Sequence, residues 1–173
     1  MSPVSESKRI GLISDTHMPH RGQELPKELV RGLQGVDLIL HAGDWTAPFV
    51  IDRLSEIAPV DGVAGNNDGP DLIARWGRRK IVTVEGVRIG LVHGDGYSRP
   101  TEENARRAFA KEDVDLIVFG HSHKPWKGEL DDVLLFNPGS ACDKRRESRY
   151  SYGILEIGGS GFELHHHYYA DKS

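Results

Sequence analysis

Five short apolar runs end in the same way, and this repeat is the feature that most constrains the fold. Each run is rich in Val, Ile and Leu, as buried β-strands are. Each is followed at once by Asp, Asn or His, usually beside glycine, and in chain order these ends read "SDTH", "HAGD", "GNND", "VHGD" and "GHSH". Sites in open α/β sheets lie outside the carboxyl ends of the strands. The repeat therefore predicts one crevice where polar side chains from several strands meet.

Helical patterns separate the first strands. Residues 25–33 carry apolar side chains at helical spacing, and residues 48–57 open with a proline, which suits a first helical turn. A third helix is expected over residues 101–113, where Thr101 and Asn104 form a partial capping box. This alternation predicts an α/β fold with helices on both faces.

The remaining apolar runs predict mostly antiparallel strands. Residues 80–95 read as a hairpin that turns at residues 85–86. The runs at 132–140, 151–157 and 161–169 close the chain. We expect this last third to form a second, mostly antiparallel sheet packed beside the first.

Length, charge and cysteine content exclude several classes of protein. The 173 residues predict a single domain over 1–173, with a frayed polar start at 1–7. A net charge of −4 gives no basic field for nucleic acid, and no apolar run approaches the roughly 20 residues of a membrane span. The single cysteine, Cys142, cannot form an intrachain disulfide, so we expect a cytoplasmic protein.

The donors at the strand ends favour a transition-metal site. Imidazole, carboxylate and amide oxygen together suit Mn, Fe, Ni, Co or Zn, and the lack of clustered cysteine argues against structural zinc. At least seven such donors are too many for one ion with an open position, and they suit two ions roughly 3.5–4 Å apart that share a carboxylate.

The same five motifs, in this order, resemble those of the calcineurin-like metallophosphoesterase family. The small size of the chain and "NPGS" at residues 137–140 are similar to its compact phosphodiesterase branch. The resemblance spans almost the whole chain. It implies a four-layer α/β/β/α sandwich, in which two packed mixed β-sheets are flanked by helices. It also implies two divalent metal ions, with manganese expected first, and a small phosphodiester substrate.

The resemblance further implies two ligand sets around a bridging carboxylate. The first ion would be held by Asp15, His17 and His123, the second by Asn66, His93 and His121, and Asp44 would bridge both. Two cations lower the pKa of a bridging water. The resulting hydroxide would attack phosphorus in line while the metals offset charge on the other oxygens.

One position departs from the family's larger branch, which commonly has "GNHD". Asn67 stands where that histidine is expected to protonate the leaving group. Asparagine cannot act as a general acid but can donate a hydrogen bond to phosphate. We therefore expect a phosphodiesterase, with phosphomonoesterase activity as an alternative. The expected catalytic residues are Asp44, Asn67 and Asp68, of which Asp68 would orient Asn67 or a ligand histidine.

Several other residues allow two interpretations. His20 and Arg21 either contact substrate phosphate or belong to a solvated loop. His41 is expected to support the site from the core, and Asp95 to be a turn or supporting acid. The histidines at 165–167 lie in a predicted strand whose neighbouring side chains point to opposite faces, so three of them cannot chelate together.

Two further features also stay open. The basic loop at residues 143–149 is either a solvated hairpin or a funnel for an anionic substrate. Trp45 and Trp126 flank metal motifs and either line the mouth of the site or pack in the core.

A binding scaffold is the rival to an enzyme. The retromer scaffold subunit shares the expected fold and a "PHR" stretch like that at residues 19–21, but departs from the ligand set at several positions. This chain keeps every expected ligand, and crowding seven polar groups is costly without a metal. Relatives often form oligomers, so a homo-oligomer is also expected.

Overall fold

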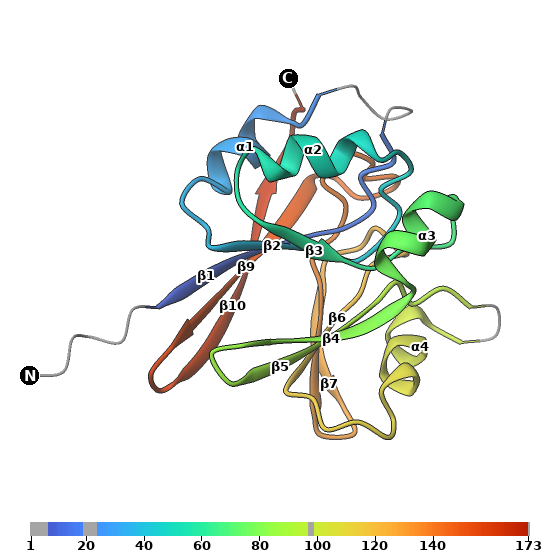
Figure 1. The fold of residues 1–173 in the computed structure, drawn as a ribbon, viewed down its shortest axis with the longest axis vertical. Coiled ribbons are helices and arrows are strands. Elements are labelled where there is room, and N and C mark those ends of the chain that lie inside the picture. Colours follow the sequence, from blue (N-terminus) through green and yellow to red (C-terminus); the bar gives the residue numbers. More distant parts are fainter. Residues whose placement is uncertain (1–6, 19–23, 97–98, 173) are drawn as a thin grey trace, which may run out of the picture.

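Two five-stranded mixed sheets form the centre of the molecule (Figure 1). The computed structural model describes residues 7–18, 24–96 and 99–172. In spatial order the first sheet contains β10 (Gly161–Tyr169), β9 (Tyr150–Gly158), β1 (Lys8–Ile13), β2 (Leu38–His41) and β3 (Val60–Gly62). The second contains β4 (Arg79–Val84), β5 (Val87–Val92), β6 (Leu116–Val118), β8 (Val133–Asn137) and β7 (Trp126–Leu130).

Helices flank both sheets, as predicted. They are α1 (Lys27–Gly32), α2 (Phe49–Ser55), α3 (Pro70–Trp76) and α4 (Thr101–Ala108). Successive side chains of β1 point to opposite faces of the first sheet. Ile10 and Leu12 therefore pack between the two sheets, whereas Ile13 packs under α1 and α2. On the far side, Phe109, just after α4, packs on the second sheet. The predicted sandwich of two mixed sheets flanked by helices is confirmed.

The prediction for the last third of the chain is wrong. β9 and β10 extend the first sheet, since β9 pairs antiparallel with β1, whereas β7 and β8 join the second sheet through β6. Alternation of residue types predicts a strand but does not say which open edge it joins. The hairpin between β4 and β5 is confirmed, and Glu85 and Gly86 turn with φ of 48° and 81°.

The capping-box prediction at α4 is also wrong. Pro100 precedes the helix, and no side chain caps it. Instead, the Asn104 amide donates to the carbonyls of Gly94 and Arg99, at 3.3 Å each. Asn104 thus ties the helix to the loop that follows His93.

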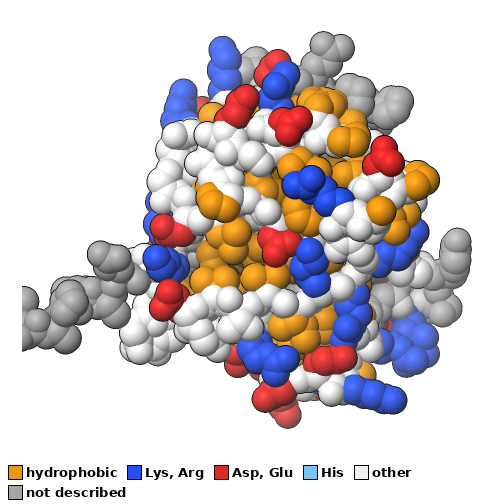
Figure 2. All heavy atoms as spheres, viewed as in Figure 1, with side chains coloured by type: hydrophobic (Ala, Val, Ile, Leu, Met, Phe, Trp, Pro, Cys, Tyr) orange, Lys and Arg blue, Asp and Glu red, His pale blue; other side chains and the backbone are white. Residues whose placement is uncertain are grey.

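The described residues present a surface of mixed charge and short helices (Figure 2). Figure 2 shows acidic and basic side chains interspersed on one face, without a large patch of either sign. Among the described residues, the helices are too short and too polar for any of them to span a bilayer.

Candidate metal centre

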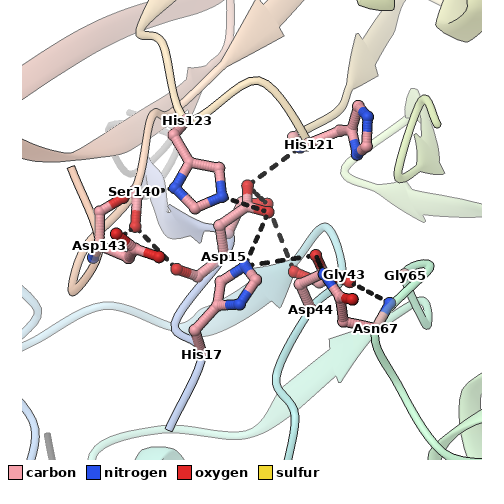
Figure 3. A network of polar contacts seen from close by, with 12 residues as sticks. Asp15, His17, Gly43, Asp44, Gly65, Asn67, His121, His123, Ser140 and Asp143 are labelled. Atoms are coloured by element: carbon pink, nitrogen blue, oxygen red, sulfur yellow. Dashed lines mark hydrogen bonds and ion pairs between the residues drawn. The ribbon is translucent and has the colours of Figure 1, made fainter. Parts of the chain in front are cut away.

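The ends of five strands converge at the junction of the two sheets. Backbone hydrogen bonds connect them: Asp15 N–H donates to Gly43 O at 2.9 Å, His17 N–H to Asp44 O at 3.1 Å, and Gly120 N–H to His93 O at 3.0 Å. The predicted convergence of strand ends is therefore present, and Figure 3 shows side chains from the ends of β1, β2 and β6 pointing toward one another.

Left-handed backbone recurs in the loops that carry these side chains. Six non-glycine residues have positive φ and occur as pairs two residues apart: Asp15 (55°) and His17 (47°), Asp44 (62°) and Thr46 (69°), and His121 (72°) and His123 (64°). Each costs roughly 1–2 kcal/mol relative to ordinary backbone. Strain of this kind gathers at functional sites, where the surrounding structure holds it in place.

Asp15 lies at the middle of the cluster. Its Oδ2 accepts hydrogen bonds from Ser14 Oγ at 2.7 Å and from His121 N–H at 3.0 Å. Its Oδ1 lies 3.6 Å from His17 Nε2 and His93 Nε2, and 3.4 Å from His123 Nε2. The carboxylate is thus fixed through one oxygen and presents the other to three imidazoles.

Asp44 contacts one histidine from each expected ligand set. Its Oδ2 lies 3.3 Å from His17 Nε2 and 3.2 Å from His93 Nε2. Asn67 donates to both oxygens of this carboxylate, from its backbone N–H and its side-chain amide, each at 2.9 Å. Asp44 therefore lies between a histidine of each expected ligand set.

Two histidines are oriented through their other ring nitrogen. Nδ1 of His93 donates to Ala42 O at 2.9 Å, and Nδ1 of His123 donates to Asp143 O. Such bonds fix the tautomer and direct Nε2 toward a ligand.

The donor atoms fit a metal ion. Four buried atoms in the cluster have no hydrogen-bond partner among the described residues: Asp15 Oδ1, His17 Nε2, His93 Nε2 and His123 Nε2. Buried polar atoms are normally paired. Two groups bring their ligand atoms within 4.8 Å of one another, namely Asp15 with His17 and His123, and Asp15 with Asp44 and His93. The four unpaired atoms are divided between these two groups, each of which could hold a cation.

The charges of the cluster are coupled. Burial opposes ionisation of Asp15 and Asp44, but the neighbouring imidazoles outweigh it and hold both pKa values below the ordinary range. Burial likewise opposes protonation of His17 and His93, yet the two carboxylates raise the pKa of each to about 9. Without a metal, protons on these two imidazoles balance the negative charge of the carboxylates. A bound cation would replace these protons.

Comparison with known proteins identifies the family. Residues 9–160 match the model of the calcineurin-like phosphoesterase superfamily domain. The chain belongs to this superfamily. It is 40% identical over 131 residues to a probable metallophosphoesterase of Methanothermobacter thermautotrophicus. The aligned residues cover 76% of each chain. It is 27% identical over 164 residues to a phosphodiesterase of Methanocaldococcus jannaschii, with 87% of this chain and 90% of that one covered.

A search of solved structures finds proteins of the same fold. Vps29 from Entamoeba histolytica, in a complex with Zn²⁺, superposes with a TM-score of 0.76 at 24% identity, over 95% of this chain and 94% of that one. At this identity the likeness shows a shared calcineurin-like fold alone.

The remaining expected ligands of this phosphoesterase lie at the rim. Asn66 is exposed and His121 is half-buried, and their side chains contact each other, with His121 Nδ1 3.2 Å from Asn66 Oδ1. The His121 ring also lies edge-on to His93, with centroids 5.2 Å apart. The geometry thus brings five predicted ligands into one cluster and leaves these two beside it.

Asp68 has partners that the sequence did not indicate. Its Oδ2 accepts from the backbone N–H groups of Asp44 and Gly65, and its Oδ1 from that of Thr46, all at 2.8 Å. Burial raises the pKa of Asp68 despite these bonds. Asp68 therefore fixes the backbone of the Asp44 loop, rather than contacting Asn67 or a ligand histidine.

His41 supports the site from the core, as expected. It is fully buried, and its Nδ1 accepts from Gly43 N–H at 3.0 Å, so Nε2 carries the proton toward Thr16 Oγ1 at 3.2 Å. Burial lowers the pKa of His41 to about 3, which keeps the ring neutral. The ring stacks on Trp45 with centroids 3.9 Å apart, and Trp45 is a buried core residue.

Other sequence candidates lie elsewhere. Trp126 is half-buried and packs edge-on against the core residue Phe119, and Asp95 is an exposed acid whose charge acts on His121. The predicted substrate contacts His20 and Arg21 lie outside the described residues.

The three neighbouring histidines of β10 have separate partners. His166 donates to Asn137 O at 2.7 Å, His167 stacks on Tyr152, and His165 lies 3.4 Å from Glu163. They do not share a ligand site.

Two serines were missed as supports of Asp15. The Ser14 hydroxyl donates a hydrogen bond to the Asp15 carboxylate, and Ser140 Oγ donates to the Asp15 backbone carbonyl at 2.7 Å. Both serines stand inside motifs already recognised, "SDTH" and "NPGS". Their place inside these motifs is the only sequence feature that could have indicated this supporting role.

Proposed function

We propose that this metallophosphoesterase is a phosphodiesterase with a dinuclear metal centre. The observation that carries the proposal is the convergence of four unpaired buried donor atoms on Asp15, His17, His93 and His123. The phosphodiesterase of M. jannaschii, similar over 87% of this chain, supports the choice of reaction.

The ligands divide into three roles in this proposal. Asp15, His17 and His123 would hold one ion, His93, His121 and Asn66 would hold the other, and Asp44 would contribute to both. When bound, the ions acidify a water and offset negative charge on the phosphoryl oxygens. Manganese is the first choice of metal, and nickel, iron, cobalt and zinc suit the same donors.

The chain's own residues keep this centre in position. Asp68 fixes the Asp44 loop through three backbone N–H groups, and the neutral His41 ring accepts the Gly43 N–H and stacks on Trp45. Asn67 holds Asp44 and lies exposed at the rim, where its amide can also donate to a phosphate oxygen. Because Asn67 cannot supply a proton, an alkoxide leaving group gains no help from it. Diesters with aryl leaving groups are therefore the preferred artificial substrates.

Other features of the chain support the setting of this activity. The thiol of Cys142 is buried, and burial raises its pKa to about 12, so it stays protonated and unreactive. Because the chain has this one cysteine, it forms no intrachain disulfide, which fits a reducing compartment, and we place the enzyme in the cytoplasm as a single domain.

The test compares an aryl phosphodiester with the matching monoester after addition of Mn²⁺ or Ni²⁺. We expect turnover of the diester, a slower reaction of the monoester, and loss of both in Asp44→Ala. Asp113→Ala removes an exposed acid outside the site and serves as the matched control. A faster monoester reaction would refute the inference from Asn67. Two bound metals without turnover of either ester would favour a binding scaffold instead.

A further inference from the structure

A cation-lined cavity adjoins the metal centre on its His123 side. The loop after β8 passes behind this histidine, where the backbone carbonyl of Asp143 accepts the His123 Nδ1 proton. Asp143 N–H donates to Ser140 Oγ at 2.8 Å, and Ser140 Oγ donates to the Asp15 carbonyl. Figure 3 shows Asp143 and Ser140 beside His123 and Asp15. The loop is therefore tied to the metal ligands through two residues.

The cavity has a volume of about 240 Å³ and opens on the surface. It is lined by Cys142, Asp143, Lys144, Arg145, Tyr150 and Lys172. Three of these side chains are cationic and one is a carboxylate, in a protein whose overall charge is −4. A local excess of positive charge in a hollow attracts an anion.

The lysines are held near the cavity by contacts of their own. Lys172 Nζ donates to Cys142 O at 2.9 Å. The ammonium groups of Lys144 and Lys172 lie 5.6 Å and 5.4 Å from the centre of the Tyr150 ring. Side chains already ordered in this way lose less conformational entropy when they bind a ligand.

Arg145 connects the cavity with the metal centre. It is exposed and lies two residues after Asp143, whose backbone carbonyl accepts the His123 Nδ1 proton. Its backbone is left-handed, with a φ of 51°, an uncommon conformation for arginine. Arginine is the side chain best suited to bidentate contact with phosphate.

We propose that this cavity binds a second phosphate group of the substrate, so that the preferred diester carries a phosphomonoester besides the bond that is cleaved. This inference rests on the proposed phosphodiesterase activity. The metal centre would take the scissile group, and Lys144, Arg145 and Lys172 would take the terminal phosphate. A dinucleotide with a 5′-phosphate has this chemistry.

The first test compares a 5′-phosphorylated dinucleotide with the same dinucleotide lacking that phosphate, beside an aryl diester. We expect kcat/KM to be roughly tenfold higher for the phosphorylated dinucleotide. Arg145→Gln and Lys144→Met should each remove most of this preference. Arg146→Gln removes the same charge from an exposed position of the same loop that does not line the cavity, and should leave the preference intact.

Equal rates for the two dinucleotides, or equal losses in Arg145→Gln and Arg146→Gln, would overturn the inference while leaving the phosphodiesterase intact. Absence of aryl diester turnover would instead refute the proposed function.

A second readout does not use activity. Inorganic phosphate titrated into the metal-free protein should shift the backbone amide NMR signals of residues 143–145, with at least fivefold weaker binding in Arg145→Gln. Shifts confined to the loops of Asp15 and Asp44, or unchanged affinity in the variant, would contradict the assignment.

Discussion

Replacing Gly65 by alanine should inactivate the enzyme by displacing Asp44. A Cβ atom on Gly65 would lie 2.3 Å from Asp44 Oδ1, 2.6 Å from the Asp44 backbone nitrogen and 2.9 Å from His93 Cγ. Ordinary contact begins at 3.4 Å, so the carboxylate must retreat by about 1 Å. A displacement of this size costs roughly 100-fold in rate. Overpacking should also destabilise the fold by about 1–3 kcal/mol.

The assay follows kcat/KM on an aryl phosphodiester, together with bound metal by elemental analysis and folding by circular dichroism. Gly69→Ala is the matched control, since a Cβ there meets nothing within 4 Å. We expect Gly65→Ala to fold, with reduced metal content and activity, and Gly69→Ala to match the wild type. A Gly65→Ala enzyme with full metal content and full turnover would show that the position of Asp44 does not control the reaction.

Three further predictions concern the same centre. Manganese at about 100 times its Kd should stabilise the folded protein by about 2.7 kcal/mol, read as a rise in Tm by calorimetry. Asp15→Asn should remove this rise, and an equal rise in that variant would argue against the site. His41 has a pKa of about 3 when folded and an ordinary value of 6.5, so its contribution to stability is present above pH 6.5 and is lost as the pH falls toward 3. Between pH 6.5 and 5 the loss is about 2 kcal/mol, and urea unfolding of His41→Asn should lack this part of the pH dependence. Asn67→His should raise the monoester-to-diester rate ratio by roughly tenfold or more by restoring a group that titrates near neutral pH; an unchanged ratio would refute the explanation for diester preference.

Local patterns predicted the elements well, because buried strands and amphipathic helices leave a periodic trace. The pairing of β9 with β1 left no such trace, since any apolar strand can add to an open edge. Two elements were missed for other reasons. The helix α3 is short, and it is held by Leu72 and Trp76 packing in the core, which is a tertiary effect. The strand β7 alternates half-buried and exposed side chains but is interrupted by Gly128.

The donor residues of the site could be predicted because each follows the end of a strand. The differences in burial and hydrogen bonding among these residues could not be predicted. His121 and His123 stand two residues apart in one motif, yet His123 is buried with an unpaired Nε2 and His121 lies at the rim. The partners of Asp68 depend on the pairing of β2 with β3, which brings the Asp44 loop beside it. Such contacts follow from three-dimensional packing and have no local signature.

The position of β1 between β2 and β9 has a consequence for how the protein is made. Ribosomes release the amino-terminal end first, so β1 and β2 can pair early, while the other edge of β1 waits for residues 150–158 to emerge. During that interval the bare backbone of Lys8–Ile13 resembles an exposed sheet edge, which invites pairing with another nascent chain. A chain cut before Tyr150 would keep that edge open permanently and would be prone to aggregate.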